Sequence, residues 1–341
     1  MNIFYFVIGV VIVLVNIYDM IYTILSPRGS ALLADRISRW FWRFALKVSG
    51  KNGRNKLLEY IGPLILLGVV LTWIIILWLG NTLIVYSDPQ ALWSSQDSAY
   101  VTGFYNKLYF AAYVLSSMGN GDYTPASDWW LFFTGFISYT GVVFISLGIS
   151  FLIPVVEGIT LKRKLSMQIH NLGETPERII SNYNSNNFEQ LSSALSDLEA
   201  PLLKVAQSHL AYPVIHYFHS VNINESLPVQ LATLDETLSI LLYQVEEDNF
   251  EDRLSMERTY KSLTYYLSTL ASAFIHPGDD EPEHPNTDYL QDLKKSDQAI
   301  DDSANRKLAA RRKLLLAYLQ NDGWEWDVIE KKEKVTIKER I

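Results

Sequence analysis

The chain contains three apolar runs that are each long enough to cross a lipid bilayer. They comprise residues 3–25, 61–86 and 129–156. A membrane-spanning helix needs about twenty apolar residues, because it rises about 1.5 Å per residue through a hydrocarbon core about 30 Å thick. Inside lipid such a chain must satisfy its backbone hydrogen bonds internally, which favours helices. The first run lacks a basic start and a small-residue cleavage site, so we interpret it as a retained span rather than a signal peptide.

The distribution of basic residues predicts how these spans are oriented. Eight Lys and Arg lie between the first and second spans, and a Lys-Arg-Lys triplet at 162–164 follows the third. The connection 87–106, after the second span, has none. Because basic residues favour the cytoplasmic side, we expect a multi-pass protein of the cell membrane, in a bacterium the inner membrane. Its N-terminus would lie outside, and the part after the third span would be cytoplasmic.

Charge divides the chain into a nearly neutral first part and an acidic second part. Residues 1–159 carry nine Lys or Arg and eight Asp or Glu, whereas 160–341 carry twenty and twenty-nine, which gives net charges of +1 and −9. An acidic second part argues against a nucleic-acid partner. The absence of Cys excludes disulfides and thiolate metal sites. No Ser-His-Asp arrangement, phosphate loop or paired-carboxylate motif indicates an enzyme, so we expect neither catalysis nor a cofactor.

A short glycine-containing stretch before the third span is the strongest candidate for a functional site. Seven residues, Ser116-Ser117-Met118-Gly119-Asn120-Gly121-Asp122, follow an aromatic-rich segment at 104–115 that we expect to be helical. Two glycines around one ordinary residue let the backbone alternate between left- and right-handed conformations, so that successive carbonyl oxygens can point the same way. Carbonyls stacked in this manner can replace the water shell of a small cation. The pattern therefore predicts a cation site.

This part of the chain, residues 108–125, resembles the pore helix and selectivity filter of tetrameric potassium channels. The Thr-Val-Gly-Tyr-Gly-Asp filter of that family corresponds here to Ser117-Met118-Gly119-Asn120-Gly121-Asp122. The resemblance implies an all-α membrane protein with an outer helix, a pore helix, the filter and an inner helix. One additional transmembrane helix would precede this pore module, and a cytosolic helical domain would follow it. The expected domains are 1–58 (N-terminal span and a basic amphipathic helix), 59–159 (pore) and 160–341 (cytosolic regulatory domain).

The resemblance also assigns roles to individual residues. The ion-binding residues of the filter would be Ser117, Met118, Gly119, Asn120 and Gly121. One chain supplies a single copy of a ring of carbonyls, so the functional unit is expected to be a homotetramer around permeant K⁺. Ser116, Tyr113 and Asp122 would support the filter. Tyr113 stands where some members carry a Glu that pairs with the filter Asp, and its phenol is expected to donate to Asp122.

Three functions stay open at this point. Asn120 replaces the Tyr or Phe whose ring braces the filter in the family, and it could form hydrogen bonds behind the filter instead. A potassium-selective channel is favoured, and a weakly selective Na⁺/K⁺ channel is the alternative. A third possibility is a membrane-anchored helical signalling or adaptor protein with a non-conducting pore. Such an adaptor would not need Gly-x-Gly-Asp at the end of a short aromatic helix.

Residues of the third span are candidates for gating. Gly141 follows the second filter glycine at the spacing of the family's hinge glycine, and Gly148 is a second candidate. Pro154 removes a helix hydrogen bond and is expected to kink or end the helix. Close helix packing would explain both glycines equally well. No span carries Arg at every third position, so the sequence shows no voltage sensor.

The connection after the first span contains a basic amphipathic helix, predicted at 34–48. Its basic residues are Arg36, Arg39, Arg43 and Lys47, opposite apolar Trp40 and Phe44. Such a helix can lie among lipid headgroups with its basic face on anionic phosphates, or it can serve as a simple anchor. Asp19 is the acid inside the first span, and we expect a structural role in which Arg28 or Arg36 neutralises it.

The second half is expected to be a cytosolic helical bundle. The predicted helices are 176–183, 188–212, 229–246, 251–275 and 288–320. Apolar stripes on the third and fourth of these helices are expected to form the core. The stripes are Leu231, Leu234, Leu238, Leu241 and Leu242 on the third, and Leu263, Tyr266, Leu267, Leu270 and Phe274 on the fourth. His209, His216 and His219 could meet at a metal, although packed or surface histidines are favoured. The segment 276–288, with His276, Asp279, Asp280, Glu281, Glu283 and His284, reads as a flexible acidic linker rather than a divalent-cation site.

Overall fold

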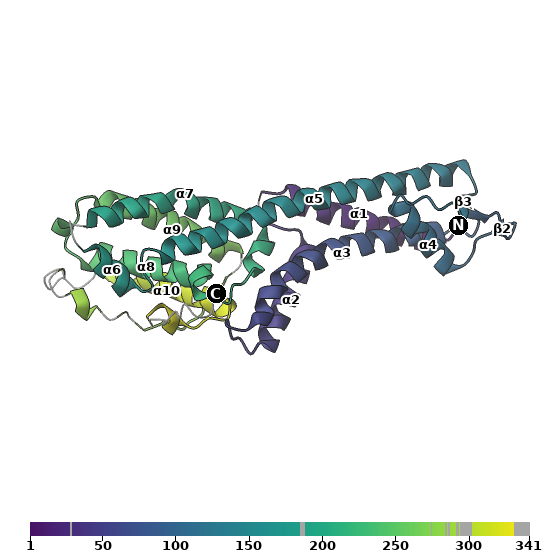
Figure 1. Cartoon of the computed structure of the whole chain (residues 1–341). Coiled ribbons are helices and arrows are strands. Elements are labelled where there is room, and N and C mark those ends of the chain that lie inside the picture. Colours follow the sequence, from purple (N-terminus) through teal and green to yellow (C-terminus); the bar gives the residue numbers. More distant parts are fainter. Residues whose placement is uncertain are drawn as a thin grey trace, which may run out of the picture. The chain divides into compact units, whose positions relative to one another are not determined.

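The structure is a computed structural model that describes residues 1–27, 29–184, 188–273, 275–283, 285, 287–290, 293 and 302–330. The described part is mostly helical (Figure 1). The helices are α1 (Ile3–Leu25), α2 (Leu32–Val48), α3 (Lys56–Tyr86), α4 (Phe104–Leu115), α5 (Asp128–His170), α6 (Pro176–Tyr183), α7 (Glu189–Ala211), α8 (Leu227–Gln244), α9 (Arg253–Ala273) and α10 (Asp302–Asn321). Short 3-10 helices occur at Pro213–Tyr217, Ile223–Glu225, Glu247–Asn249, Asp288–Leu290 and Trp326–Ile329. The helical membrane-protein fold expected from the sequence is confirmed.

One small antiparallel sheet interrupts this helical fold. Strands β1 (Leu92–Ser94), β2 (Ala99–Tyr100) and β3 (Tyr123–Pro125) pair in the order β2-β1-β3. These strands were not predicted from the sequence, because two or three residues are too few to show a period of two.

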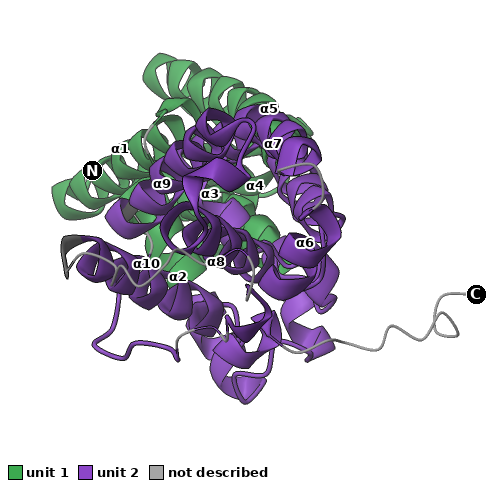
Figure 2. Ribbon diagram, turned by 90° about the vertical axis from the view of Figure 1, so that its left-hand side faces the viewer, with its two compact units in different colours: residues 1–39, 64–156 green, residues 40–63, 157–341 purple. Residues whose placement is uncertain are grey.

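The chain forms two compact units, which Figure 2 colours separately. Unit 1 contains Met1–Arg39 and Leu64–Val156, and unit 2 contains Trp40–Pro63 and Glu157–Ile341. Helices α2, α3 and α5 therefore each contribute residues to both units. The domain boundaries expected after residues 58 and 159 stay predictions.

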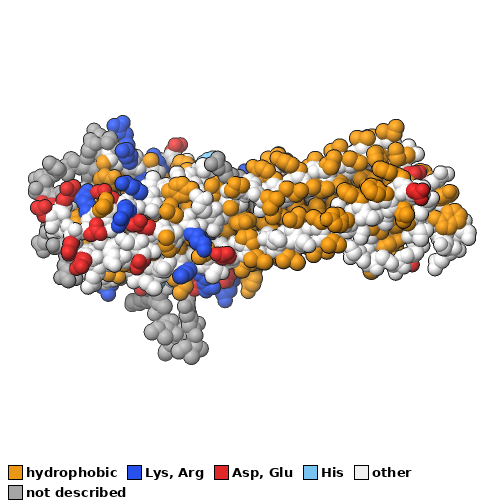
Figure 3. Space-filling view, turned by 90° about the horizontal axis from the view of Figure 1, so that it is seen from above, with side chains coloured by type: hydrophobic (Ala, Val, Ile, Leu, Met, Phe, Trp, Pro, Cys, Tyr) orange, Lys and Arg blue, Asp and Glu red, His pale blue; other side chains and the backbone are white. Residues whose placement is uncertain are grey.

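Within the described part of the chain, three helices are long and apolar enough to cross a membrane, as predicted: α1, α3 and α5. Large apolar side chains on them are exposed, with Leu14 at 59%, Leu64 at 54% and Phe132 at 69%. On the face drawn in Figure 3, hydrophobic side chains cover the spans of unit 1, and charged side chains gather on unit 2. An exposed apolar surface of this kind is typical of helices that are surrounded by lipid.

Helix α5 continues beyond the point where the sequence predicted an end. Pro154 lies inside the helix, which runs on to His170 instead of ending near residue 156. The reason is tertiary packing, since Leu165 and Ile169 are fully buried in the core of unit 2. Burying a side chain of this size contributes about 1.5–3 kcal/mol. This burial offsets the hydrogen bond that the proline removes.

The buried acid of α1 has partners other than the expected arginines. Oδ2 of Asp19 accepts a hydrogen bond from Nε1 of Trp73 at 2.9 Å, and its Oδ1 accepts one from the backbone N–H of Leu33 at 2.9 Å. Leu33 lies in the first turn of α2, where unpaired N–H groups favour a negative charge. Arg36 is exposed, and Arg28 lies outside the described residues. Asp19 therefore has the structural role that was expected, as a cap for α2.

The core of unit 2 is built around α8, which is buried from Leu227 to Leu242. The predicted leucine stripe of α8 and the Leu263, Tyr266, Leu267 and Leu270 stripe of α9 both belong to this core. Phe274, the last member of the α9 stripe, lies outside the described residues. The predicted helix 288–320 is wrong in its first part, because Asp288–Leu290 is a 3-10 turn and α10 begins at Asp302.

Two ion pairs join α8 to α10 inside this core. Arg311 binds Asp235, and Nε of Arg312 lies 2.6 Å from Oε1 of Glu236. Burial raises the pKa of Glu236, while the hydrogen bond and charge of Arg312 oppose this shift. Removing one member of a buried pair leaves an uncompensated charge, which costs about 3–5 kcal/mol. The packing of α10 is thus fixed by charge as well as by apolar contact.

Candidate functional site

The candidate site is the loop that follows the C-terminus of α4. Positive φ angles occur at Ser117 (58°), Gly119 (63°) and Gly121 (81°), and the residues between them have negative φ. The left- and right-handed alternation predicted from the glycines is therefore confirmed, and it begins one step earlier, at Ser117. Such a backbone can direct successive carbonyl oxygens to one side.

Helix α4 holds the beginning of this loop through its last carbonyls. The backbone N–H of Met118 donates to the carbonyl of Tyr113 at 2.9 Å, and Oγ of Ser116 donates to the same carbonyl at 3.1 Å. The hydroxyl of Ser117 lies 3.2 Å from that of Ser138 on α5. These contacts connect the loop to both helices, and the role of Ser116 as a support of the filter stays a prediction.

A polar network formed by Tyr109, Asn120 and Asp122 lies beside the loop. The phenol of Tyr109 donates to Oδ2 of Asp122 at 2.8 Å. Nδ2 of Asn120 donates to the same Oδ2 at 2.6 Å and also to the oxygen of Tyr109. Asn120 thus forms the hydrogen bonds that were expected in place of an aromatic brace.

The expected bond between Tyr113 and Asp122 is wrong. The phenol of Tyr113 donates to the backbone carbonyl of Tyr123 at 2.7 Å. Tyr109 lies one turn earlier on the same face of α4 and is the residue that reaches Asp122. Tyr113 still supports the loop, because its bond holds the first residue after Asp122.

The sheet holds the end of the loop. Strand β3 begins at Tyr123, directly after Asp122, and pairs with β1 in the register Ser94↔Tyr123 and Leu92↔Pro125. The loop is therefore anchored on one side by a helix and on the other by main-chain pairing. Aromatic and β-branched residues in these strands were the only signal in the sequence.

A buried lysine lies near the start of α4. Lys107 is fully buried, and its ammonium donates to the carbonyls of Asp88 at 2.5 Å and Val85 at 3.2 Å. Oδ2 of Asp88 accepts a hydrogen bond from Nε1 of Trp130 at 2.9 Å. Lys107 thereby ties α4 to the end of α3, where orphan carbonyls favour a cation. The sequence analysis did not single out this residue.

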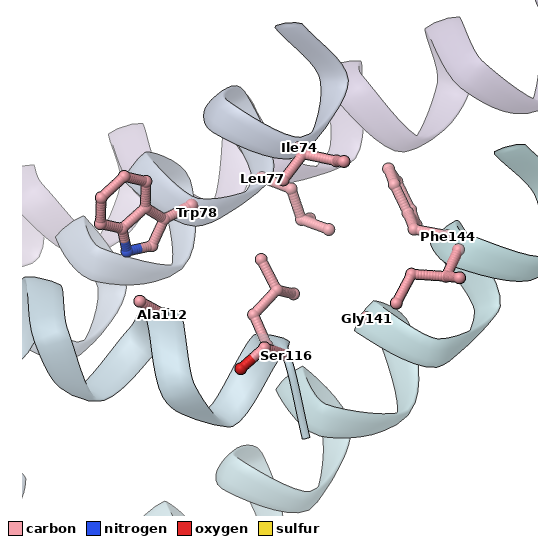
Figure 4. A pocket seen from close by; sticks show the side chains of 9 residues that line it. Ile74, Leu77, Trp78, Ala112, Ser116, Gly141 and Phe144 are labelled. Carbon is pink, nitrogen blue, oxygen red and sulfur yellow. The ribbon is translucent and has the colours of Figure 1, made fainter. Parts of the chain in front are cut away.

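The predicted gating residues differ in their surroundings. A Cβ placed on Gly141 would lie 1.9 Å from the carbonyl oxygen of Leu115, at the end of α4, whereas one on Gly148 would meet nothing within 4 Å. Gly141 also borders an apolar cavity of about 240 Å³. Figure 4 shows this cavity, with Gly141 and Phe144 of α5 facing Ser116, the residue after α4, and residues of α3. Gly141 is thus a position of close helix packing; its role in gating stays a prediction, as do those of Gly148 and Pro154.

His209, His216 and His219, the candidate metal ligands, lie in unit 2. They are buried, and the described residues hold no group of three metal-ligating side chains. Nδ1 of His209 lies 3.2 Å from the carbonyl of Val205, and Nδ2 of Asn321 lies 2.7 Å from Nε2 of His216. Packed histidines, the favoured interpretation, account for these contacts. Of the acidic linker, His276, Asp279, Asp280 and Glu281 are exposed, and His284 lies outside the described residues.

Comparison with known proteins places this geometry in a family. Residues 65–157, which include most of α3, all of α4, the loop and α5 to Glu157, match the family model described as "Ion channel". The protein therefore carries a module of this ion channel family. It is also similar to the uncharacterized membrane protein YdjJ of Bacillus subtilis (strain 168), with 30% identity over 335 residues and 97% of each chain covered. No solved structure matches the chain significantly.

Proposed function

We propose that the protein is a homotetrameric channel that conducts K⁺ through the loop 116–122. The observation that carries the proposal is the alternation of φ at Ser117, Gly119 and Gly121, at the end of a short helix inside the matched region. The ion-binding carbonyls would be those of residues 117–121. These residues are exposed in the single chain, as expected for groups that face a shared axis.

Selectivity for K⁺ over Na⁺ is supported by the network around Asn120. A filter needs a fixed cavity size or a fixed set of carbonyl dipoles to discriminate between ions. Hydrogen bonds among Tyr109, Asn120 and Asp122 restrain the loop in place of an aromatic brace. The weakly selective Na⁺/K⁺ channel stays the alternative, because a polar brace is smaller than an aromatic ring.

Reconstitution in liposomes tests conduction and selectivity together. Purified protein should release K⁺ from loaded vesicles, and Gly119→Ala should abolish release, because Ala is strained at a φ of 63°. Under opposed K⁺ and Na⁺ solutions, the reversal potential should lie far from zero. A reversal potential near zero would support the weakly selective channel, and no flux from folded protein would support the non-conducting adaptor.

The proposed orientation follows from the basic residues around α2 and after Val156. In this orientation the N-terminus and the loop's outer end face outside, and unit 2 is cytoplasmic and modulates gating. A cysteine introduced in the basic α2–α3 connection should react with a membrane-impermeant reagent only from the cytoplasmic side. The chain offers a clean background, since it has no native Cys.

Helix α2 is proposed to contact anionic lipid. Its basic residues are all exposed: Arg36, Arg39, Arg43 and Lys47. Trp40 and Phe44 on the same helix are 63% and 59% exposed, and their rings stack with centroids 5.8 Å apart. The two rings share the exposed face of α2 with the basic side chains, so the prediction that they lie opposite one another is wrong. Aromatic rings beside basic side chains suit the headgroup layer of a membrane. Flux should fall when anionic lipid is replaced by zwitterionic lipid, and neutralising the four basic residues should remove that dependence. A simple anchor would show neither effect.

A further inference from the structure

One short segment of unit 2 lies between the ends of two membrane-spanning helices. This wedge segment, residues 213–220, comprises the 3-10 helix Pro213–Tyr217 and the three residues after it. A Cβ on Gly62, in the first part of α3, would lie 2.9 Å from the ring of Phe218. A Cβ on Gly158, in the last part of α5, would lie 2.4 Å from Cδ1 of Ile215. The wedge segment therefore packs closely against both α3 and α5, at two glycines where an added Cβ would crowd its side chains.

An ammonium group binds the wedge segment to α5. Lys162 is 6% exposed, and its Nζ donates to the carbonyl of Phe218 at 2.6 Å and lies 3.4 Å from that of Ile215. A charge-assisted bond of this length is among the stronger hydrogen bonds in proteins. The wedge segment and α5 are thus expected to move together.

His219 binds the wedge segment to the connection that precedes α3. Its Nε2 lies 2.6 Å from the carbonyl oxygen of Gly53, and its Nδ1 lies 3.1 Å from Oδ2 of Asp322, just after α10. Both neighbours are acceptors, and a neutral imidazole has only one N–H. An imidazolium ring has two N–H groups and could donate to both neighbours at once. The two distances therefore suit an imidazolium ion.

The charges around His219 determine how strongly it holds its second proton. Burial disfavours the charged ring, but Asp322 and the Gly53 carbonyl outweigh burial, so the pKa of His219 is raised above its usual 6.5. Lys162 on α5 opposes this shift. Burial and Lys162 lower the pKa of neighbouring His216 to about 3, so that ring adds no charge near neutral pH.

Three further charged groups face the same side of the wedge segment. Glu59 of α3, Arg163 of α5 and Glu225 line a cavity beside His219 of about 180 Å³. Arg163 and Glu225 form an ion pair of 2.6 Å.

The direction in which stability depends on pH follows from the raised pKa of His219. Its stabilising contribution is complete below pH 6.5 and is lost as the pH rises through the folded-state pKa.

We propose that His219 is an intracellular pH sensor that gates the channel by fixing or releasing the wedge segment between α3 and α5. This inference rests on the proposed function and on the cytoplasmic orientation of unit 2. Loss of one proton breaks the contact with Gly53 or with Asp322. The α2–α3 connection, which contains Gly53, then no longer moves with the wedge segment, which packs on α5. Gating changes because both helices continue from unit 2 into the pore.

Full-length protein in K⁺-loaded liposomes, with the pH clamped on both sides, tests this sensor. Between about pH 6 and about pH 9 the K⁺ flux should change about tenfold, the size expected when one hydrogen bond to a charged group is lost. The midpoint should lie above 6.5. His219→Gln cannot titrate and should remove the pH response. Asp322→Asn removes the charge that favours the imidazolium and should shift the midpoint to lower pH.

The matched control is His276→Gln, the same substitution at an exposed histidine of unit 2. This variant should keep the full pH response. An unchanged midpoint in Asp322→Asn, or a wild-type pH response in folded His219→Gln, would overturn the inference. Flux that is equal at every pH would also overturn it while leaving the channel function intact. Absence of flux at every pH in wild type and control would instead contradict the proposed function.

Discussion

Replacing Gly141 with Ala tests whether this glycine is needed for close helix packing or acts as a hinge. The new Cβ would lie 1.9 Å from the carbonyl oxygen of Leu115, whereas an ordinary C···O contact is about 3.3 Å. Helices α4 and α5 would have to separate by about 1.4 Å. The atom that is struck belongs to the backbone, so a rotamer change cannot relieve the contact. Overpacking of this kind costs about 1–3 kcal/mol.

We therefore expect Gly141→Ala to lower the melting temperature of the purified protein and to reduce K⁺ flux at all conditions. Gly148→Ala is the matched control, because its Cβ would meet nothing within 4 Å in the chain. In the control, Ala should stabilise the helix by about 0.5–1 kcal/mol. If Gly141 acted only as a hinge, Gly141→Ala would alter the open probability and leave the melting temperature unchanged. Wild-type melting and wild-type flux in Gly141→Ala would refute the packing argument.

Other substitutions test the remaining contacts. Tyr109→Phe removes the donor to Asp122 and should lower the K⁺/Na⁺ permeability ratio measured from reversal potentials; an unchanged ratio would mean that this bond does not brace the filter. Arg312→Met should destabilise the protein by about 3–5 kcal/mol in thermal denaturation, and adding Glu236→Leu should restore most of the loss. Asp19→Asn leaves one of two donors unpaired and should cost about 1–3 kcal/mol; no loss of stability would argue against the cap.

The sequence predicted the helical elements well because their signals are local. The first span and the helix at Pro176–Tyr183 have the predicted bounds. The positive φ angles at Gly119 and Gly121 followed from the glycines, whereas that of Ser117 was not predicted. The strands were too short to carry a period, and the end of α5 depends on burial of Leu165 and Ile169 in a core that forms from distant segments.

The partners of polar side chains were harder to predict. Tyr109 and Tyr113 lie one turn apart on the same face of α4, so spacing alone does not show which phenol reaches Asp122. The acids of α8 meet arginines that are 76 positions later in the chain. Nothing local indicates such a pairing, and the contacts of His219 with Gly53 and Asp322 are equally non-local.

The charged pairing of α8 with α10 has a consequence for biosynthesis. Asp235 and Glu236 are 1% exposed in the finished fold, yet their arginines leave the ribosome only after residue 312 has been made. By then all three spans have long been available for insertion into the membrane. The nascent protein must therefore keep α8 hydrated, or protected by a chaperone, until α10 has been made.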